Sequence, residues 1–245
     1  MKSNLAAVRK MPVSESVYRQ LHEKIVRREL APGAPLPAER QMSQMLGVNR
    51  GAVREAIKRL QQAGLVSVSQ GGNTTVLDYL DDAGLELLPA LLVTGEETLD
   101  HAVVRSVMAM RSALAPEVAA SAAERGGAAL ADALEAHLKE MRADPHNLKG
   151  LQRGALAFWR KLVEGSGNVA FRLAFNSMSK SYTQALDLLV PVLAAEYRDF
   201  ENLARIAQAV RTADAEAARG AARAHVDIGR KAVDAALSRL EGGKS

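Results

Sequence analysis

The chain of 245 residues contains no cysteine. This absence excludes disulfide frameworks, thiolate zinc sites, iron–sulfur clusters and cysteine nucleophiles. No apolar run approaches the roughly 18 residues that a membrane helix needs, and the most apolar one, at 87–93, contains Pro89. The first residues also lack the apolar region of a secretory signal. We therefore expect a cytoplasmic protein that does not span a membrane.

Aromatic residues are scarce, with nine in the chain, and seven of the nine fall within 158–200. This clustering predicts a large core or a cavity in that window. The remaining composition, 48% hydrophobic and 24% charged, is typical of a folded globular protein. The length suits two modest domains.

The charge is divided unevenly. Residues 1–77 hold twelve Lys/Arg against five Asp/Glu, whereas the rest of the chain holds twenty against twenty-three. A basic module joined to a weakly acidic one is typical of a protein whose first part meets a polyanion. A basic surface that is merely solvated would give the same charge balance. The residue pattern therefore has to distinguish it from a polyanion-binding module.

The first 77 residues have the pattern of three helices followed by a hairpin. Apolar residues recur at helical spacing in three segments, which end before the turn at 30–33, at Gly47 and at Gly64. Pro37 suits the start of the second helix, and Asn49 can cap the third. Two strand-like segments, 65–69 and 74–77, flank the turn at 70–73. This order predicts a winged helix-turn-helix, in which the third helix enters the DNA major groove.

The outward face of the third helix carries Arg50, Arg54 and Lys58 at four-residue spacing. Arginine can bond guanine edges bidentately or clamp phosphate, and the small Gly51 lets the backbone approach DNA. The turn after the first strand would reach the minor groove. The expected DNA-binding residues are Arg40, Asn49, Arg50, Gly51, Arg54, Gln70 and Gly71.

Four segments, at 36–40, 46–50, 53–57 and 60–66, read LPAER, LGVNR, VREAI and LQQAGLV. Together they resemble the DNA-binding domain of the GntR family of bacterial transcription regulators. The resemblance implies that Arg40, Arg50 and Arg54 contact operator DNA, with Gly71 near the minor groove. The chain departs from the family at Asn49 and Gly51, where hydroxyl residues that can bond phosphate are usual.

Residues 96–245 read almost entirely as helix, because the segment is rich in alanine and confines glycine and proline to boundaries. We expect six or seven antiparallel helices there, with Pro116 ending or bending the first. Residues 78–95, which begin with an acidic run and contain Pro89, are expected to link the two domains. The fold class is therefore mostly α: domain 1–77, linker 78–95 and helical domain 96–245.

The helical domain is similar to the effector domain of the FadR subgroup. The resemblance is carried by Met110-Arg111, by Phe158 before Ser166-Gly-Asn168, and by the run from Asp214 to His225. It implies a homodimer that binds a small molecule. Many relatives hold a divalent metal with one Asp and three His. The corresponding positions here are Ala155, Trp159, Leu203 and His225. One imidazole is too few ligands, so we predict no metal and no other cofactor.

The resemblance is stronger to the fatty-acid regulators of the subgroup, which bind a long-chain acyl-CoA, although Val226 and Asp227 differ from the polar residues of that pocket. It implies effector contacts from Arg111, Trp159, Tyr182 and His225. Arg111 lies on an apolar helix face, so it either binds an anionic effector or pairs with a protein carboxylate. His225 is either a buried core histidine or a ligand contact.

Enzyme motifs are absent: the chain has no G-x-S-x-G elbow and no H-E-x-x-H. We expect a homodimeric repressor that binds an inverted-repeat operator and responds to an acyl-CoA, a fatty acid or another amphipathic anion. One alternative is a metal-dependent regulator of small organic acids. Another is a ligand-binding or enzymatic helical protein that does not act on DNA.

Overall fold

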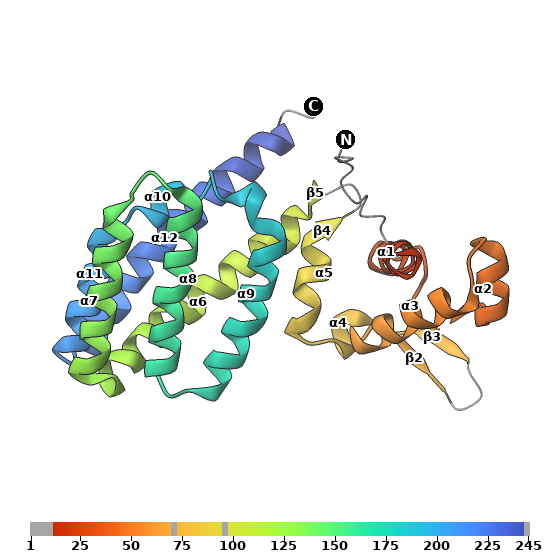
Figure 1. Cartoon of the computed structure of the whole chain (residues 1–245), viewed down its shortest axis with the longest axis horizontal. Helices are drawn as coiled ribbons and strands as arrows, with labels where there is room; N and C mark the ends of the chain where they lie inside the picture. Colours follow the sequence, from red (N-terminus) through yellow and green to blue (C-terminus); the bar gives the residue numbers. More distant parts are fainter. Residues whose placement is uncertain (1–11, 70–72, 95–97, 243–245) are drawn as a thin grey trace, which may run out of the picture. The chain divides into compact units, whose positions relative to one another are not determined.

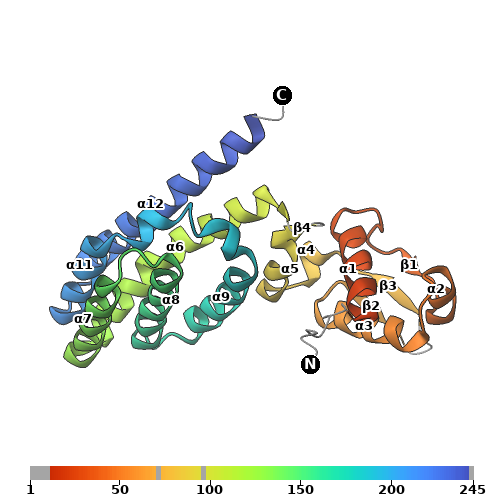
Figure 2. The same cartoon turned by 45° about the horizontal axis from the view of Figure 1, so that its top comes forward.

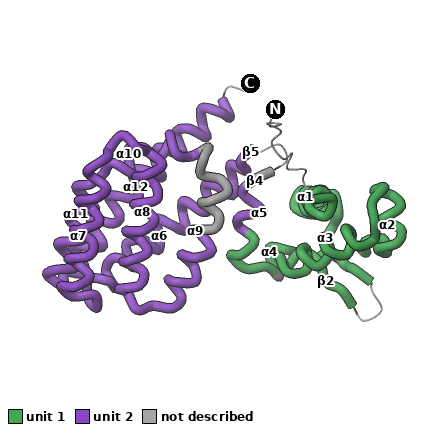
Figure 3. Tube along the Cα trace, in the orientation of Figure 1, with its two compact units in different colours: residues 1–87 green, residues 88–245 purple. Residues whose placement is uncertain are grey.

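The computed structural model of the chain describes residues 12–69, 73–94 and 98–242, without the side chains of residues 82, 93, 94, 98 and 180–188. The chain divides into two compact units, Met1–Leu87 and Leu88–Ser245, which are coloured separately in Figure 3. Each unit is described by itself. No helix among the described residues combines the length and apolarity that crossing a membrane requires.

The first unit contains three principal helices and a small sheet (Figure 1). Its elements in chain order are α1 (Val13–Val26), β1 (Pro35–Leu36), α2 (Glu39–Met45), α3 (Arg50–Gln62), β2 (Val66–Val68), β3 (Thr74–Val76), α4 (Tyr79–Asp82) and a 3-10 turn (Leu85–Leu87).

Helices α2 and α3 end at glycines, as the sequence predicts. Gly47 and Gly64 have φ angles of 64° and 70°, a left-handed conformation that only glycine adopts without strain. Beyond each glycine the next N–H returns to a carbonyl of the last helical turn, from Val48 to Ser43 over 3.0 Å and from Leu65 to Leu60 over 2.9 Å. The turn between α2 and α3 is therefore fixed by local chemistry.

The sheet has three antiparallel strands in the order β1-β3-β2. The hairpin of β2 and β3 was predicted, and in the structure Ser67 lies opposite Thr75. The sequence did not indicate β1, which spans two residues and includes Pro35. Such a short strand has no periodicity of its own, and its pairing with β3 decides its conformation. Because Pro35 and Leu36 lie in β1, α2 begins after Ala38 and not at Pro37.

The core of the first unit joins α1 to α3 and to the sheet. Val17, Leu21 and Ile25 of α1 are buried against α3, whereas Val13, in the first turn of the same helix, is 47% exposed. The first helical turn therefore extends past the packed region. In α3 the buried face consists of Ala52, Val53, Ala56, Ile57 and Leu60.

The second unit is a helical bundle (Figures 1 and 2). After α5 (Leu88–Leu92) and the short pair β4 (Val93–Thr94) and β5 (Thr98–Leu99), seven helices follow within residues 98–242, inside the predicted range. They are α6 (His101–Arg125), α7 (Gly127–Ala143), α8 (Leu148–Gly165), α9 (Val169–Leu189), α10 (Ala194–Tyr197), α11 (Phe200–Arg211) and α12 (Ala215–Gly242).

Helices α6 and α12 run antiparallel along most of their lengths. Ion pairs mark the two ends of this contact, from Arg105 to Glu241 and from Arg219 to Glu117. On the other sides, α11 packs on α12 and α7, while α8 packs on α6 and α7. Phe158 of α8 is fully buried in the core that these helices share.

Helix α6 does not end at Pro116, contrary to one of the two outcomes expected from the sequence. It continues from His101 to Arg125 with Pro116 inside it. Proline removes one helical hydrogen bond, but Ala115, Val118, Ala119 and Ala122 around it are buried in the core. We attribute the continuation to this packing, which outweighs the local preference.

Residues 78–95, which were expected to be a linker, are divided between the two units and contain helical segments in each. The first unit includes α4 and the 3-10 turn, and the second begins with α5. Leu87 and Leu92 are buried.

Candidate DNA-binding face and effector cavity

The outward face of α3 is a row of cations. Arg50, Arg54 and Lys58 are exposed, while the opposite face of the same helix is buried in the core of the unit. The side chains of Arg54 and Lys58 are each 60% exposed. Because the core fixes the rotation of α3 about its own axis, these three side chains must point to solvent.

The N-terminus of α3 is built by Asn49. Its side-chain oxygen accepts the N–H of Ala52 over 2.8 Å, which confirms the predicted cap. A side chain at Gly51 would place its Cβ 3.2 Å from this oxygen, so glycine leaves room for the cap. Residues 49–51 are exposed, so the positive end of the helix dipole lies at the surface beside Arg50. Such an end attracts phosphate.

The cations near this face differ in their partners. The guanidinium of Arg54 donates to both carboxylate oxygens of Glu39, the shortest bond being 2.9 Å, and this pairing raises the pKa of Arg54. Lys58 pairs with Glu55 over 3.2 Å. Arg40 and Arg50 are exposed, and neither has an ion-pair partner within the described residues. Arg50 therefore needs to give up no partner when it meets a phosphate or a base.

Two of the predicted contacts, Gln70 and Gly71, lie outside the described residues. The strands that lead to them are in place, since Val68 pairs with Thr74 at the described end of the hairpin. Their role at the minor groove stays a prediction.

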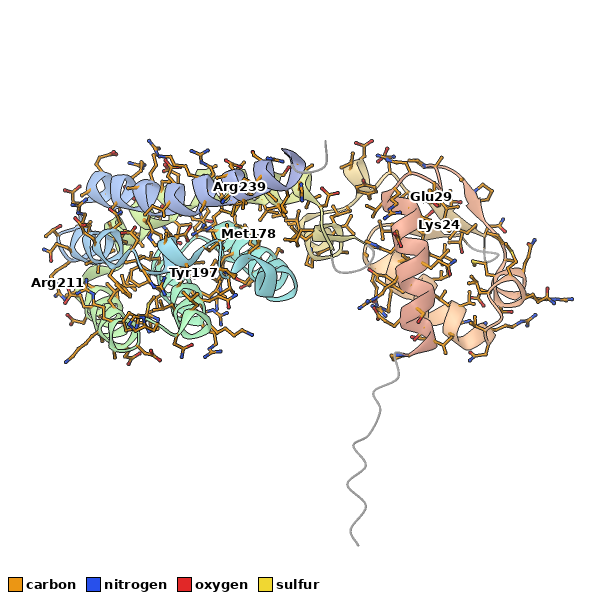
Figure 4. All side chains as sticks on the ribbon, turned by 90° about the horizontal axis from the view of Figure 1, so that it is seen from above. Lys24, Glu29, Met178, Tyr197, Arg211 and Arg239 are labelled. Atoms are coloured by element: carbon orange, nitrogen blue, oxygen red, sulfur yellow. The ribbon has the colours of Figure 1, made fainter. Side chains whose placement is uncertain are left out.

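The second unit contains a cavity of about 80 Å³ lined by residues of α6, α8, α9 and α10. This space can hold several non-hydrogen atoms. Most of its wall is hydrocarbon, including Val118, Trp159, Phe171 and Met178. In Figure 4, Met178 and Tyr197 lie within this unit, whereas Arg211 is at its outer edge. The aromatic-rich window thus supplies much of this wall.

Arg111 lines this cavity and pairs with Glu196 of α10. Nη1 donates to one carboxylate oxygen over 2.7 Å, and Nη2 donates to the other. The side chains are 12% and 2% exposed, so this ion pair is buried. Of the two readings of Arg111, the pairing with a protein carboxylate is present in the structure. The sequence left a protein carboxylate open as one of two partners for Arg111, beside an anionic effector. It did not identify Glu196, because α10 is four residues long and Glu196 is 85 positions from Arg111.

His225 is fully buried, and its Nδ1 lies 2.9 Å from a carboxylate oxygen of Asp199. Burial alone would raise the pKa of Asp199, but hydrogen bonds from His225 and Asn202 outweigh it and lower this pKa. Nε2 of His225 lies 3.7 Å from Glu196, and the ring centroid is 6.1 Å from that of Trp159. His225 is thus a buried, paired histidine beside the cavity wall, and its contact with an effector stays a prediction. The side chain of Tyr182 lies outside the described residues.

A metal does not fit the donor set around His225. Ala155, Trp159 and Leu203, at the positions where the resemblance places ligands, offer no imidazole or carboxylate. The nearby carboxylates are engaged, Asp199 by His225 and Glu196 by Arg111. In the part of the chain that the structure describes, no group of three or more His, Asp or Glu is arranged to hold an ion.

Comparison with known proteins agrees with this geometry. A model described as bacterial regulatory proteins, gntR family, matches residues 13–76, and a model of the FCD domain matches residues 106–228. The HTH-type transcriptional regulator Mce2R of Mycobacterium tuberculosis is 36% identical over 233 residues, which cover 95% of this chain and 96% of Mce2R. The fatty acid metabolism regulator protein of Serratia proteamaculans is 28% identical over 163 residues, 66% of each chain.

A solved structure shares the fold. The structure of Lar, which controls the agr system of Listeria monocytogenes, aligns with a TM-score of 0.59 at 18% identity, covering 92% of this chain and 98% of that one.

A helix-turn-helix with a wing, followed by a helical domain that encloses an apolar cavity, defines a DNA-binding transcription regulator with an effector-binding domain. The chain belongs to the GntR family of bacterial regulatory proteins and carries an FCD domain, as the sequence resemblance indicated.

Proposed function

We propose that this protein is a homodimeric repressor that works in the cytoplasm on an inverted-repeat operator. The observation that carries the proposal is the cationic face of α3, with Arg50 unpaired among the described residues at a capped helix N-terminus. Arg40, Asn49, Gly51 and Arg54 would add contacts to the backbone or bases, and Gln70 and Gly71 would reach the minor groove. A two-fold symmetric protein requires a two-fold symmetric site.

The effector is proposed to be an acyl-CoA or another amphipathic molecule that places its apolar part in the cavity, without a bound metal. The hydrocarbon wall and Trp159 support this choice. The similarity to a fatty acid metabolism regulator of Serratia proteamaculans gives separate support. Arg111, Tyr182 and His225 complete the proposed site.

Effector binding would act on DNA affinity through a difference in affinity for two states of the dimer. Such couplings typically amount to about 1–3 kcal/mol, or about 5- to 150-fold in the DNA dissociation constant. Repression needs only occupancy of a promoter, which binding through the α3 face would provide.

The proposal is tested by selecting bound duplexes from random DNA with the full-length protein. We expect an enriched inverted repeat whose affinity falls steeply as salt rises, because each phosphate contact releases counterions. A long-chain acyl-CoA is expected to weaken this binding within the range above. Binding without salt dependence, or enrichment of no symmetric sequence, would contradict the DNA-binding proposal.

A second candidate is a metal-dependent regulator of a small organic acid. It is favoured by one observation, that Asp199 and Glu196 both approach His225, at 2.9 and 3.7 Å. Since a metal-free protein loses no ligand to a chelator, we expect EDTA, and equally added zinc, to leave the melting temperature unchanged. A fall of several degrees with EDTA, reversed by zinc, would establish the metal-dependent alternative.

A further inference from the structure

We infer that Glu196 determines the specificity of the effector cavity, so that it accepts uncharged acyl groups such as esters and thioesters and rejects free carboxylates. The inference rests on the proposed function only in taking this cavity as the effector site.

The charge of Arg111, the cation among the described residues of the cavity lining, is already neutralised. Both terminal nitrogens of Arg111 donate to the carboxylate of Glu196. Glu196 is 2% exposed, so the bonds form away from water, where an ion pair is held strongly. A ligand carboxylate would have to displace Glu196 in order to reach the same nitrogens.

The charge of the described cavity lining also disfavours a carboxylate. Among the described residues that line the cavity, Arg111 and Glu196 are the charged ones, and their charges cancel. An entering carboxylate would lose its water and meet the like charge of Glu196 without a free cation, which is unfavourable in a site of low dielectric.

The carboxylate of Glu196 lies against the backbone of α12 at Gly229. A Cβ atom added at Gly229 would overlap a carboxylate oxygen of Glu196, so this carboxylate occupies the space that a larger residue would fill. The same added atom would lie 2.9 Å from Leu193. Glycine at this position of a long helix thus forms a slot for the carboxylate.

A hydrogen-bond donor in the cavity wall is available to a neutral ligand. The indole N–H of Trp159 is buried and has no hydrogen-bond partner among the described residues, although Trp159 lines the cavity. An indole can only donate, and the carbonyl of an ester or thioester can only accept. A neutral carbonyl satisfies this donor without adding charge.

Trp159 also provides the measurement, since it is the one tryptophan of the chain. Its fluorescence is followed while the full-length protein is titrated with octanoate or with methyl octanoate at neutral pH. We expect the wild type to bind the ester at least about tenfold more tightly, a difference of about 1.4 kcal/mol. Equal or tighter binding of octanoate would overturn the inference.

The variant Glu196→Gln frees the charge of Arg111 while nearly keeping the shape of the side chain. We expect it to bind octanoate at least about tenfold more tightly than the wild type does, with little change for the ester. Glu124→Gln, an exposed substitution on α6, is the matched control and should behave as wild type. An unchanged ratio of the two ligands in Glu196→Gln would also overturn the inference.

If Glu196→Gln does not fold, two measurements still test the inference: the ratio of ester to octanoate affinity in the wild type, and the same ratio in the double variant Arg111→Gln/Glu196→Gln. The double variant carries neither charge, so we expect it neither to reject octanoate as the wild type does nor to bind it as tightly as Glu196→Gln does. A lack of fluorescence response to both ligands would overturn the inference together with the assignment of the cavity. Operator binding is measured separately, so failure of the DNA-binding proposal would leave the ligand ratio intact.

Discussion

Replacing Glu196 by alanine is expected to lower the free energy of unfolding of the helical unit by about 3–5 kcal/mol. The substitution leaves the guanidinium of Arg111, which is 12% exposed, without its carboxylate partner. A buried charge that loses its partner keeps the full cost of its desolvation, which exceeds the value of most surface contacts. Chemical denaturation followed by Trp159 fluorescence reports on this unit, because the one tryptophan lies in it.

The matched control is Glu201→Ala in α11. Its pair with Arg205 is exposed, with side-chain exposures of 75% and 63%, so we expect a loss of at most about 0.5 kcal/mol. The double variant Arg111→Met/Glu196→Leu removes both charges and should recover much of the stability lost in Glu196→Ala. A loss below about 1 kcal/mol in Glu196→Ala would mean that Arg111 does not depend on this carboxylate.

Replacing Arg50 by alanine is expected to weaken binding to the selected operator by about 1–3 kcal/mol if the side chain reads a base, with relaxed preference at one position of each half-site. Arg50 is exposed at the N-terminus of α3 and has no ion-pair partner within the described residues, so its whole charge is available to DNA. Fluorescence anisotropy with labelled operator and with single-base variants measures both effects.

The control for Arg50→Ala is Arg19→Ala. Arg19 is an equally charged residue whose side chain is 61% exposed, but it lies on α1 and pairs with Glu15. Arg19→Ala should leave operator affinity within about twofold of wild type. Arg54→Ala should weaken operator binding more than Arg19→Ala and less than Arg50→Ala, because Arg54 must first break its ion pair with Glu39. If Arg50→Ala weakens all sequences equally, the residue contacts phosphate. If it changes nothing, α3 does not contact DNA through this face.

Much of the DNA-binding unit was predictable because its signals are local. The helix stops at Gly47 and Gly64 and the Asn49 cap each depend on a few neighbouring residues, and all three are present as predicted. The spacing that buries Val53 and Ile57 also turns Arg50 and Arg54 outward, so the cationic face followed from periodicity alone. The strand β1 was missed because its two residues form a strand only through pairing with β3.

In the helical unit, local signals were less decisive. The sequence predicted either a helix end or a bend at Pro116, and packing of the surrounding residues excludes the end, because α6 continues through Pro116. The number of helices was predicted because their caps and boundaries are local. The pairing of the helices was not predicted, because contacts such as those between α6 and α12 join residues more than a hundred positions apart.

The sequence by itself determined that this protein has a basic helix-turn-helix, an Ala-rich helical domain and an arginine on an apolar helix face. Only the tertiary structure decided what that arginine meets. Glu196 pairs with Arg111 and lies against Gly229 only because α6, α10 and α12 pack together. No spacing of residues along the chain predicts that packing. A buried charge requires a partner, but only packing selects which carboxylate supplies it.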